Sequence, residues 1–452
     1  MFYRDGRHLY AQRHGRYPRH SSPKNTNPPQ TINPSTTSPF TVTVNFMRKW
    51  FQNPAVKQGL VLFLALRLLL TLWAAAIITV LPPPREANET LRPYLGHPIL
   101  TEGITGTLLG PWQRFDTNHY LRIAQQGYTD ESDSVFPPLY PLLIRALGTL
   151  LGGTPTADLA AALLLSNLAA LGLFMLLAHI SGQLLGNSRA LRAVVYFAMF
   201  PTGFFLFAGY SESLFILLAL ASLWMGKNGR FWWAGILGLL ASLTRLTGWV
   251  LVVPLAYAFI TSEQGAKIRK WLPFLPQFPT TNNQSRTTDL FPILLPALGS
   301  ALFLALRWAL GLRPLGQIYA DYWYQTTGIP GADLVTAVQT IFFGGTARAG
   351  EFTLIFDLLV VVFLGVTTVQ VWRRFGAYWG LYNAMLLLFI LLPTSELKPL
   401  YSFSRYALAF IPSFWLLAEA GERPFLNRLI LYPSVVLYLW FSGQFFVWGW
   451  VA

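Results

Sequence analysis

The sequence contains no cysteine and little charge. None of its 452 residues is Cys, and only 12% are Asp, Glu, Lys or Arg. A disulfide framework and thiolate chemistry are therefore excluded, and cysteine usage gives no information about the cellular compartment. The sequence also lacks a Walker lysine loop, a GxGxxG after a strand, an HExxH and a Ser-His-Asp arrangement. Without a nucleotide cradle, a soluble nucleotide-sugar mechanism or an ATP-driven mechanism is disfavoured.

Apolar residues fill most of the chain. They make up 53% of it, and apolar runs near 20 residues long recur, which is typical of polytopic membrane proteins. The net charge of +14 is concentrated at one place. Residues 1–58 hold nine Lys or Arg and a single acid, immediately before the first apolar segment. This is the positive-inside pattern, so we predict a cytoplasmic N-terminus and no nucleic-acid partner.

The chain divides into a tail and one membrane domain. Residues 1–45 are rich in Pro, Ser, Thr, Asn and Arg without a helix-length apolar period, which predicts a disordered basic tail. Residues 46–452 form the membrane domain. Its first span is predicted at 59–81 and is followed by a long, acidic outer loop at 82–155. Single spans are expected at about 157–185, 190–208, 211–226, 291–312, 353–372, 376–392, 405–420 and 429–450. An outer turn is expected at 209–213, and the weakly charged, aromatic segment 313–352 is expected to form an outer loop.

The segment 231–262 is too long for one span and is interrupted at 244–248 by Thr-Arg-Leu-Thr-Gly. The loop after it, 263–290, is basic and should be cytoplasmic. Two short helices forming a hairpin satisfy this, whereas a single span would put the loop outside. The hairpin also puts Arg245 at the outer side, buried among helices. The total is then about eleven spans, with the C-terminus outside.

The most informative stretch, residues 112–141, lies in the first outer loop. Asp116, His119 and two arginines gather at its start in a chain that is otherwise mostly apolar, and Asp130, Glu131 and Asp133 follow as an acidic patch that we expect to be solvated. Asp116 stands where the N-cap of a helix is expected, and the following residues have helical periodicity with one apolar face. We therefore predict a helix lying at the membrane–water interface, of the kind that could wall an active site.

An ordered set of motifs extends this signal along the chain. The set comprises Phe115-Asp116, His119-Tyr120-Leu121-Arg122, the run 136–141, Phe200-Pro201-Thr202-Gly203, Tyr210-Ser211-Glu212-Ser213, Thr244-Arg245 and Ser404-Arg405-Tyr406. In this order the motifs resemble the GPI mannosyltransferase 2 (PIG-V) family and its prokaryotic relatives. The chain departs from the family in having Phe115 in place of Trp, an extra proline in the run 136–141, and Leu246 in place of Pro.

The resemblance implies a membrane glycosyltransferase of the GT-C superfamily, an all-α polytopic bundle whose long first outer loop carries interfacial helices. Such an enzyme transfers a sugar, here mannose, from a polyprenyl-phosphate donor to a lipid-linked or cell-surface glycan acceptor on the external or lumenal face, with inversion. The expected partners are this donor, a glycolipid or glycan acceptor and the bilayer. A divalent metal is compatible with the motifs but not implied, because no Asp-x-Asp pair stands at the base position.

The residue types fit this chemistry. Inverting transfer needs a general base beside the acceptor hydroxyl, and Asp116 is the candidate; its alternative role is a helix cap or a structural ion pair. A phosphate leaving group needs cations, for which Arg245 and Arg405 are candidates, alternatively as structural ion pairs. Further substrate-binding candidates are His119 (or interfacial packing), Glu212 (acceptor orientation or an arginine partner), Arg122, Tyr140 and Tyr210.

Two other functions stay open at this point. A polytopic lipid or sugar transporter or flippase would also bury arginines and acids among helices, although a single large polar outer loop and the lack of an internal repeat argue against it. The second alternative is a non-catalytic subunit of a membrane glycosylation complex. Such a subunit is expected to carry substituted motifs, and the retention of both Asp116 and Arg245 argues against it. Compact loops favour a prokaryotic plasma membrane over an ER membrane.

The hairpin at 231–262 predicts that the loop after it is cytoplasmic. Because the chain has no cysteine, single-cysteine labelling tests this directly. Leu275→Cys should not react with a membrane-impermeant maleimide in intact cells, whereas Glu89→Cys in the first outer loop should react. Labelling of position 275 from outside would contradict the hairpin.

Overall fold

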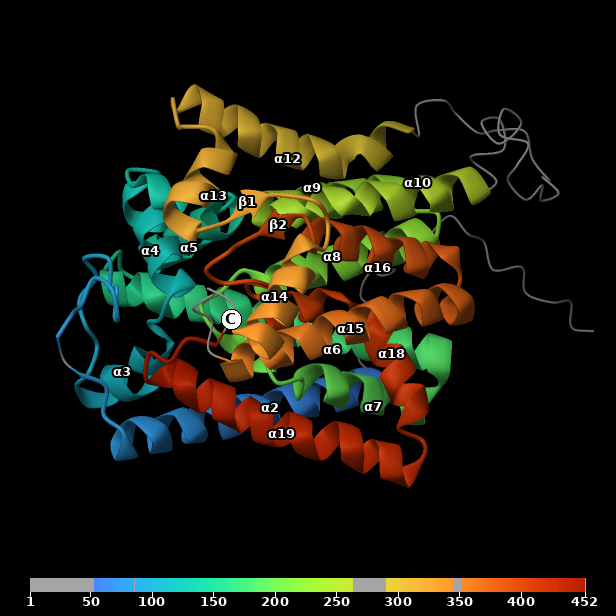
Figure 1. The fold of residues 1–452 in the computed structure, drawn as a ribbon, viewed down its shortest axis with the longest axis horizontal. Coiled ribbons are helices and arrows are strands. Elements are labelled where there is room, and N and C mark those ends of the chain that lie inside the picture. The colour runs from blue at the N-terminus through green and yellow to red at the C-terminus, as the bar shows by residue number, and fades with distance from the viewer. Residues whose placement is uncertain (1–52, 85, 263–289, 345–350, 452) are drawn as a thin grey trace, which may run out of the picture. The chain divides into compact units, whose positions relative to one another are not determined.

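The computed structural model describes residues 53–84, 86–262, 290–344 and 351–451, and this part of the chain is mainly helical (Figure 1). Five of its helices are long and apolar enough to cross a membrane. An all-α polytopic membrane protein is therefore confirmed as the class, whereas the count of eleven spans and the GT-C type of bundle stay predictions. The predicted tail at 1–45 lies outside the described residues. The five long helices are α2 (Pro54–Val80), α6 (Pro155–Leu185), α12 (Phe291–Ala309), α15 (Glu351–Phe375) and α19 (Pro424–Phe446).

Two predicted spans are wrong as single helices. The segment 190–208 is divided into α7 (Asn187–Ala198) and the 3-10 helix η3 (Gly203–Phe207). Pro201 lies between them, and proline removes a helical hydrogen bond and disfavours helical backbone before it. The segment 405–420 is divided into α17 (Phe403–Tyr406), η6 (Ala407–Ala409) and α18 (Ile411–Ala420). The shorter span at 211–226 corresponds to α8 (Glu212–Lys227), and that at 376–392 to α16 (Ala377–Ile390).

The chain turns back within 231–262, as the hairpin prediction requires. α9 (Phe231–Thr244) is followed by η4 (Leu246–Leu251) and α10 (Val252–Thr261). The ring of Phe231 lies 5.2 Å from that of Phe259, so the end of α10 returns to the start of α9. At the tip, a Cβ on Gly248 would lie 2.4 Å from the Ser242 nitrogen, so only glycine fits this close turn. Residues 263–289 lie outside the described residues, and the side of the membrane on which they lie stays a prediction.

The short elements of the first outer loop gather at one end of the long helices (Figure 1). They show that the segment 82–155 is structured and not a simple loop. α13 (Leu315–Trp323) lies at the same end, where the sequence predicted only a weakly charged loop at 313–352. The elements of the first outer loop are α3 (Gly103–Leu108), η1 (Gly110–Trp112), α4 (Asp116–Gln126), η2 (Glu131–Val135) and α5 (Leu139–Leu150).

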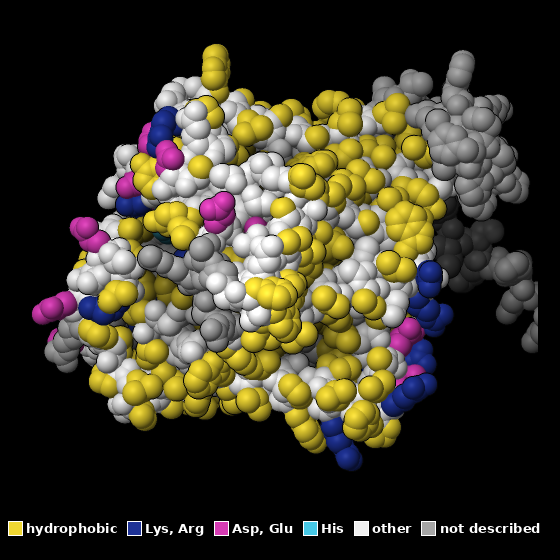
Figure 2. Space-filling view, in the orientation of Figure 1, with side chains coloured by type: hydrophobic (Ala, Val, Ile, Leu, Met, Phe, Trp, Pro, Cys, Tyr) yellow, Lys and Arg dark blue, Asp and Glu magenta, His cyan; other side chains and the backbone are white. Residues whose placement is uncertain are grey.

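The opposite end is basic. Its turns are joined by ion pairs between Arg189 and Glu422 at 2.7 Å and between Arg374 and Glu419 at 2.9 Å. In Figure 2 charged side chains gather at the two ends, and hydrophobic side chains cover most of the face between them. Charge segregated in this way, with an apolar belt between, is what a bilayer-spanning bundle requires.

A two-stranded ribbon connects distant parts of the chain near α13. β1 (Thr326–Thr327) pairs antiparallel with β2 (Pro393–Thr394), and Thr326 faces Thr394. α14 (Ala332–Phe343) follows β1. The ribbon therefore brings the segment after β2, which leads to Arg405, next to α13.

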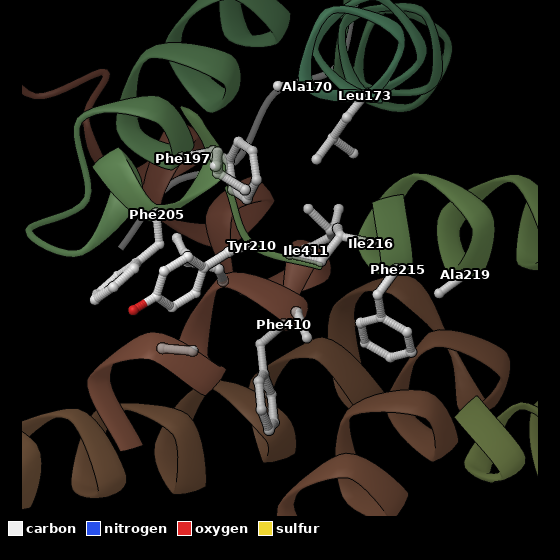
Figure 3. Close-up of a cluster of buried hydrophobic side chains, with 14 of the residues drawn as sticks. Ala170, Leu173, Phe197, Phe205, Tyr210, Phe215, Ile216, Ala219, Phe410 and Ile411 are labelled. Atoms are coloured by element: carbon white, nitrogen blue, oxygen red, sulfur yellow. The ribbon is translucent and has the colours of Figure 1, made fainter. Parts of the chain in front are cut away.

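The interior behind the outer elements is built from α6, α7, η3, α8 and α18 (Figure 3). The figure shows Phe197, Phe205, Phe215 and Phe410 pointing into one cluster, and all four are buried. The turn predicted at 209–213 is present as a bend between η3 and α8, and the structure shows that this segment is buried. The motif around Glu212 is thus part of the interior beside the outer elements.

Arg114 fastens the first outer loop to the C-terminal helix. Its side chain is 2% exposed, and its Nη2 and Nε donate to the carbonyl of Phe446 at 2.8 and 3.1 Å. Its Nη1 donates to the carbonyls of Gly110 and Gln113. A cation at a helix C-terminus satisfies carbonyls that the helix leaves unpaired. Arg114 thereby fixes the loop directly before Asp116.

This contact predicts a structural defect. Arg114→Leu removes all these donors and leaves buried carbonyls unpaired, so we expect a melting temperature lower by several degrees in detergent. The measurement is thermal unfolding of the purified protein. Arg145→Leu, at an exposed arginine of α5, is the matched control and should melt near the unsubstituted protein. Equal melting of the two variants would contradict the role assigned to Arg114.

Candidate active site

The backbone before α4 is strained. Phe115 has φ 44° and ψ −120°, a region that non-glycine residues rarely occupy. Its ring is held against Trp448 at 5.2 Å and Trp450 at 5.4 Å. Asp116 is the first residue of α4 and makes no side-chain cap bond, so the predicted N-cap role is wrong: Phe115 occupies that position. The carboxylate is free to point elsewhere.

The Asp116 carboxylate points to an arginine that lies 289 residues away in the sequence. Asp116 Oδ2 accepts a hydrogen bond from Arg405 Nη1 at 2.7 Å. Arg405 Nε lies 3.4 Å from Glu212 Oε1, and the same oxygen accepts from Arg245 Nη1 at 2.6 Å. Asp116, Glu212 and Arg405 are each at most 7% exposed, and the Arg245 side chain is 17% exposed. Four residues predicted separately from the sequence thus form one network.

Two carboxylates balance two guanidinium groups in this network. Glu212 Oε1 is shared by both arginines, while its Oε2 is buried without a hydrogen-bond partner among the described residues. Arg405 also lies over the rings of Tyr210 and Tyr406, at 5.6 and 5.7 Å from their centroids. Buried ion pairs contribute little net stability, and charged groups buried among membrane helices mark functional sites by default.

A cavity of about 310 Å³ opens beside the network. Asp116, Arg245 and Arg405 are among the residues that line it. Aromatic side chains from other elements line the rest, together with apolar residues of 135–137 and 389–393. The sequence indicated only that the 313–352 segment is aromatic and did not predict that it faces Asp116. The aromatic lining residues are Tyr120, Phe136, Tyr319, Trp323, Phe389, Tyr401 and Tyr406.

Tyr140, His119 and Arg122 are among the sequence candidates that do not line this cavity. Tyr140 is completely buried, and its hydroxyl bonds to Ser166 Oγ at 2.6 Å, behind Tyr120. His119 Nδ1 lies 2.6 Å from Asp133 Oδ1, and Arg122 forms two hydrogen bonds with the same carboxylate. In the structure these three side chains therefore bond to protein groups outside the cavity lining. The expectation of a solvated acidic patch is wrong for Asp133, which is fully buried.

Tyr210 and Ser211 support the network from behind. The backbone N–H of Asp116 donates to the Tyr210 hydroxyl at 3.3 Å. The Ser211 hydroxyl lies 2.7 Å from that of Tyr120, which lines the cavity. Tyr210 is thus a structural support for Asp116, 1% exposed and outside the cavity lining.

A surface brace holds α13 over the cavity. Arg313 donates to Glu131 at 2.6 Å and to Asp321 at 2.8 Å, and Trp323 Nε1 donates to the Ser132 carbonyl at 3.2 Å. Hydrogen bonding from Arg313 holds the pKa of the Glu131 carboxyl below its ordinary value. η2 and α13, more than 180 residues apart, are thereby joined so that Trp323 forms part of the cavity wall. Opposite charges in the two outer segments were the one signal of this contact in the sequence.

In the described ranges, no group of three or more His, Asp or Glu side chains is arranged to hold a metal ion. The cations that the site itself provides are the two arginines.

Residues 56–268 match the family described as Mannosyltransferase (PIG-V). The resemblance to this family that the motifs predicted is therefore confirmed over this segment. Three of the four network residues, Asp116, Glu212 and Arg245, fall within the PIG-V segment, and Arg405 lies beyond it.

Individual relatives are similar over a comparable length of the chain. The GPI alpha-1,6-mannosyltransferase 2 of Cricetulus griseus is 34% identical over 221 residues, which cover 46% of this chain and 44% of that protein. The Homo sapiens protein of the same name is 31% identical over 216 residues, 45% of this chain and 42% of that one. The match thus spans less than half the length of these curated relatives.

Among solved structures, ArnT from Cupriavidus metallidurans bound to undecaprenyl phosphate is similar over 74% of this chain and 72% of its own. The sequence identity is 12% and the TM-score is 0.42.

Proposed function

We propose that the protein is a GT-C type mannosyltransferase that moves mannose from a polyprenyl-phosphate donor to a glycolipid or glycan acceptor. The observation that carries this proposal is the cavity walled by Asp116, Arg245 and Arg405, two of which belong to the PIG-V segment. A carboxylate and two guanidinium groups converging on one cavity are the set that glycosyl transfer from a phosphate carrier requires.

In the proposed reaction, Asp116 takes the proton of the acceptor hydroxyl. The hydroxyl oxygen then bonds to the anomeric carbon of the mannose, while the bond from that carbon to the phosphate oxygen breaks. Attack from the face opposite the phosphate inverts the anomeric centre. The leaving group is the polyprenyl phosphate, and its growing negative charge needs cations already in place.

Arg245 and Arg405 would meet this charge, because their guanidinium forks suit phosphate oxygens. Both are paired with carboxylates at 2.6–2.7 Å, so the site has no spare positive charge. Phosphate binding would therefore redistribute existing pairs. In particular, it would draw Arg405 away from Asp116 and leave that carboxylate open to the acceptor hydroxyl.

The aromatic wall offers faces for a sugar ring. Tyr319, Trp323 and Tyr401 line the same cavity as the charged residues. The cavity lies at the end that holds the first outer elements, away from the basic turns, so we place the reaction on the external or lumenal face. Whether the membrane is a prokaryotic plasma membrane, as we favour, or an ER membrane does not alter this geometry.

The direct test is incubation of the purified protein with radiolabelled polyprenyl-phosphate-mannose and a lipid extract. Transfer of label into a new lipid or glycan product supports the proposal. Binding of the donor without any labelled product would instead fit a transporter or flippase. If the protein showed no donor binding and no transfer, that result would contradict the proposed donor chemistry.

The phosphate role makes a prediction for Arg245. Arg245→Ala should raise the KM for the donor by roughly ten- to hundredfold, because a charge-assisted contact is lost. Arg245→Lys should recover only part, since lysine lacks the planar fork. Steady-state kinetics with labelled donor provides the measurement. Arg145→Ala, at an exposed arginine of α5 outside the cavity lining, is the control. An unchanged donor KM in folded Arg245→Ala would transfer the phosphate role to Arg405.

The base role makes a sharper prediction. Asp116→Asn preserves the size of the side chain and an oxygen for Arg405 but cannot accept the proton, so turnover should fall about 10²–10⁴-fold while donor binding remains. Initial rates and donor binding are measured on the same purified sample. Asp130→Asn, a more exposed acid of the same outer segment, should keep normal turnover. A near-normal rate for Asp116→Asn would direct the search for the base to Glu212.

A further inference from the structure

The segment 395–406 supplies three cavity residues, Tyr401, Arg405 and Tyr406, on an unusual backbone. Leu400 and Ser402 have φ of 56° and 62°, the left-handed region that L-residues other than Gly, Asn and Asp rarely enter. Such strained residues persist only where the surroundings hold them. The contacts that hold this segment therefore decide where the Arg405 guanidinium lies.

Two buried carboxylates make those contacts. The Asp333 carboxylate accepts from the backbone N–H of Ser395 at 2.9 Å and of Leu400 at 3.1 Å. Asp357 Oδ1 accepts from the N–H of Ser404 at 2.8 Å, one residue before Arg405.

Ser404 is also held from its other side. The Thr202 hydroxyl donates to the Ser404 carbonyl at 2.7 Å, and Thr202 is fully buried. The N–H and the C=O of one residue are thus fixed by two side chains from elements far apart in the sequence. The peptide that leads into Arg405 is fixed in orientation, and the Phe200-Pro201-Thr202-Gly203 motif acquires a specific role.

Asp357 is unusual for its location. It lies in α15, one of the five helices with the length and composition of a membrane span, and is 7% exposed. Within the described ranges no Lys, Arg or His side chain forms an ion pair with it. A carboxylate inside an apolar helix is costly, and without a cation its contact with Ser404 is the feature that can account for it.

We propose that Asp357 is the positioning residue for Arg405: it clamps the Ser404 peptide so that the guanidinium lies between Asp116, Glu212 and the donor phosphate. The proposal rests on the proposed function for the identity of that phosphate. Asp357 does not touch substrate; it acts through the backbone. Without the clamp, the strained turn at 400–402 can relax, and displacements of about 1 Å suffice to impair a positioned group.

The test compares two substitutions of Asp357. Asp357→Asn keeps an acceptor oxygen for the Ser404 N–H, whereas Asp357→Leu keeps the size and removes the acceptor. Asp357→Leu should raise the KM for polyprenyl-phosphate-mannose by roughly tenfold or more, with a smaller change in kcat, and Asp357→Asn should stay within about threefold of the unsubstituted enzyme. The control is Thr367→Ala, which removes a buried hydrogen-bonding group from the same helix, ten residues further on.

A double-substitution cycle with Arg405→Lys separates positioning from general destabilisation. If Asp357 acts through Arg405, Asp357→Leu should add less than about twofold to the donor KM in the Arg405→Lys background. The proposal is overturned if the two effects multiply in full, if Asp357→Asn is as impaired as Asp357→Leu, or if Asp357→Leu behaves like Thr367→Ala.

Amide hydrogen exchange gives a readout that does not depend on the reaction. Asp357→Leu should speed exchange in residues 400–406, and Thr367→Ala should not. If the unsubstituted protein fails to transfer mannose, it is the proposed function that fails, and the clamp is decided by exchange alone: unchanged exchange at 400–406 in Asp357→Leu overturns it.

Discussion

The ion pair between Asp116 and Arg405 is the interaction on which the outer half of the structure depends. Its partners come from the first outer loop and from the last third of the chain, and each is held by contacts of its own. Arg114 fixes the loop before Asp116 to the end of α19, while Asp357 and Thr202 fix the peptide before Arg405. A buried ion pair contributes little net stability to the fold. The contacts that position Asp116 and Arg405 are therefore better explained by a chemical role of the pair than by a contribution to folding.

How much of this arrangement the sequence predicts depends on the range of each contact. The hairpin at 231–262 follows from local signals, a span that is too long and a basic loop after it, and the structure contains the turn. Asp116, Glu212, Arg245 and Arg405 are also found from motifs. The assembly of these residues into one network is not predicted, because no local sequence signal relates positions 116 and 405. The N-cap prediction for Asp116 is wrong for the same reason: a tertiary partner replaced the local one.

The residues whose structural roles the sequence did not predict share a physical property. Arg114 and Asp357 make side-chain contacts to distant backbone groups, and backbone partners leave no residue-type signature in the sequence. His119 and Arg122 were predicted as substrate-binding candidates, and their contact with Asp133 was not foreseen, because this acidic residue is surface-like in sequence yet completely buried in the fold. Polar residues in an apolar chain thus mark important positions reliably, but their roles depend on which partners the fold supplies.

The neutrality of the four-residue network constrains how the site can work. Asp116 and Glu212 already pair with Arg405 and Arg245. A phosphate that binds here would add negative charge, and an arginine could offset it only by exchanging its carboxylate partner for the phosphate. Glu212 has one oxygen for both arginines and another with no partner among the described residues, so it can keep Arg245 while Arg405 turns to the phosphate. In the proposed reaction, Asp116 would thereby lose its cation when the donor binds. In the structure its carboxylate is paired with Arg405; after donor binding it would face the cavity in which we propose that the acceptor hydroxyl lies.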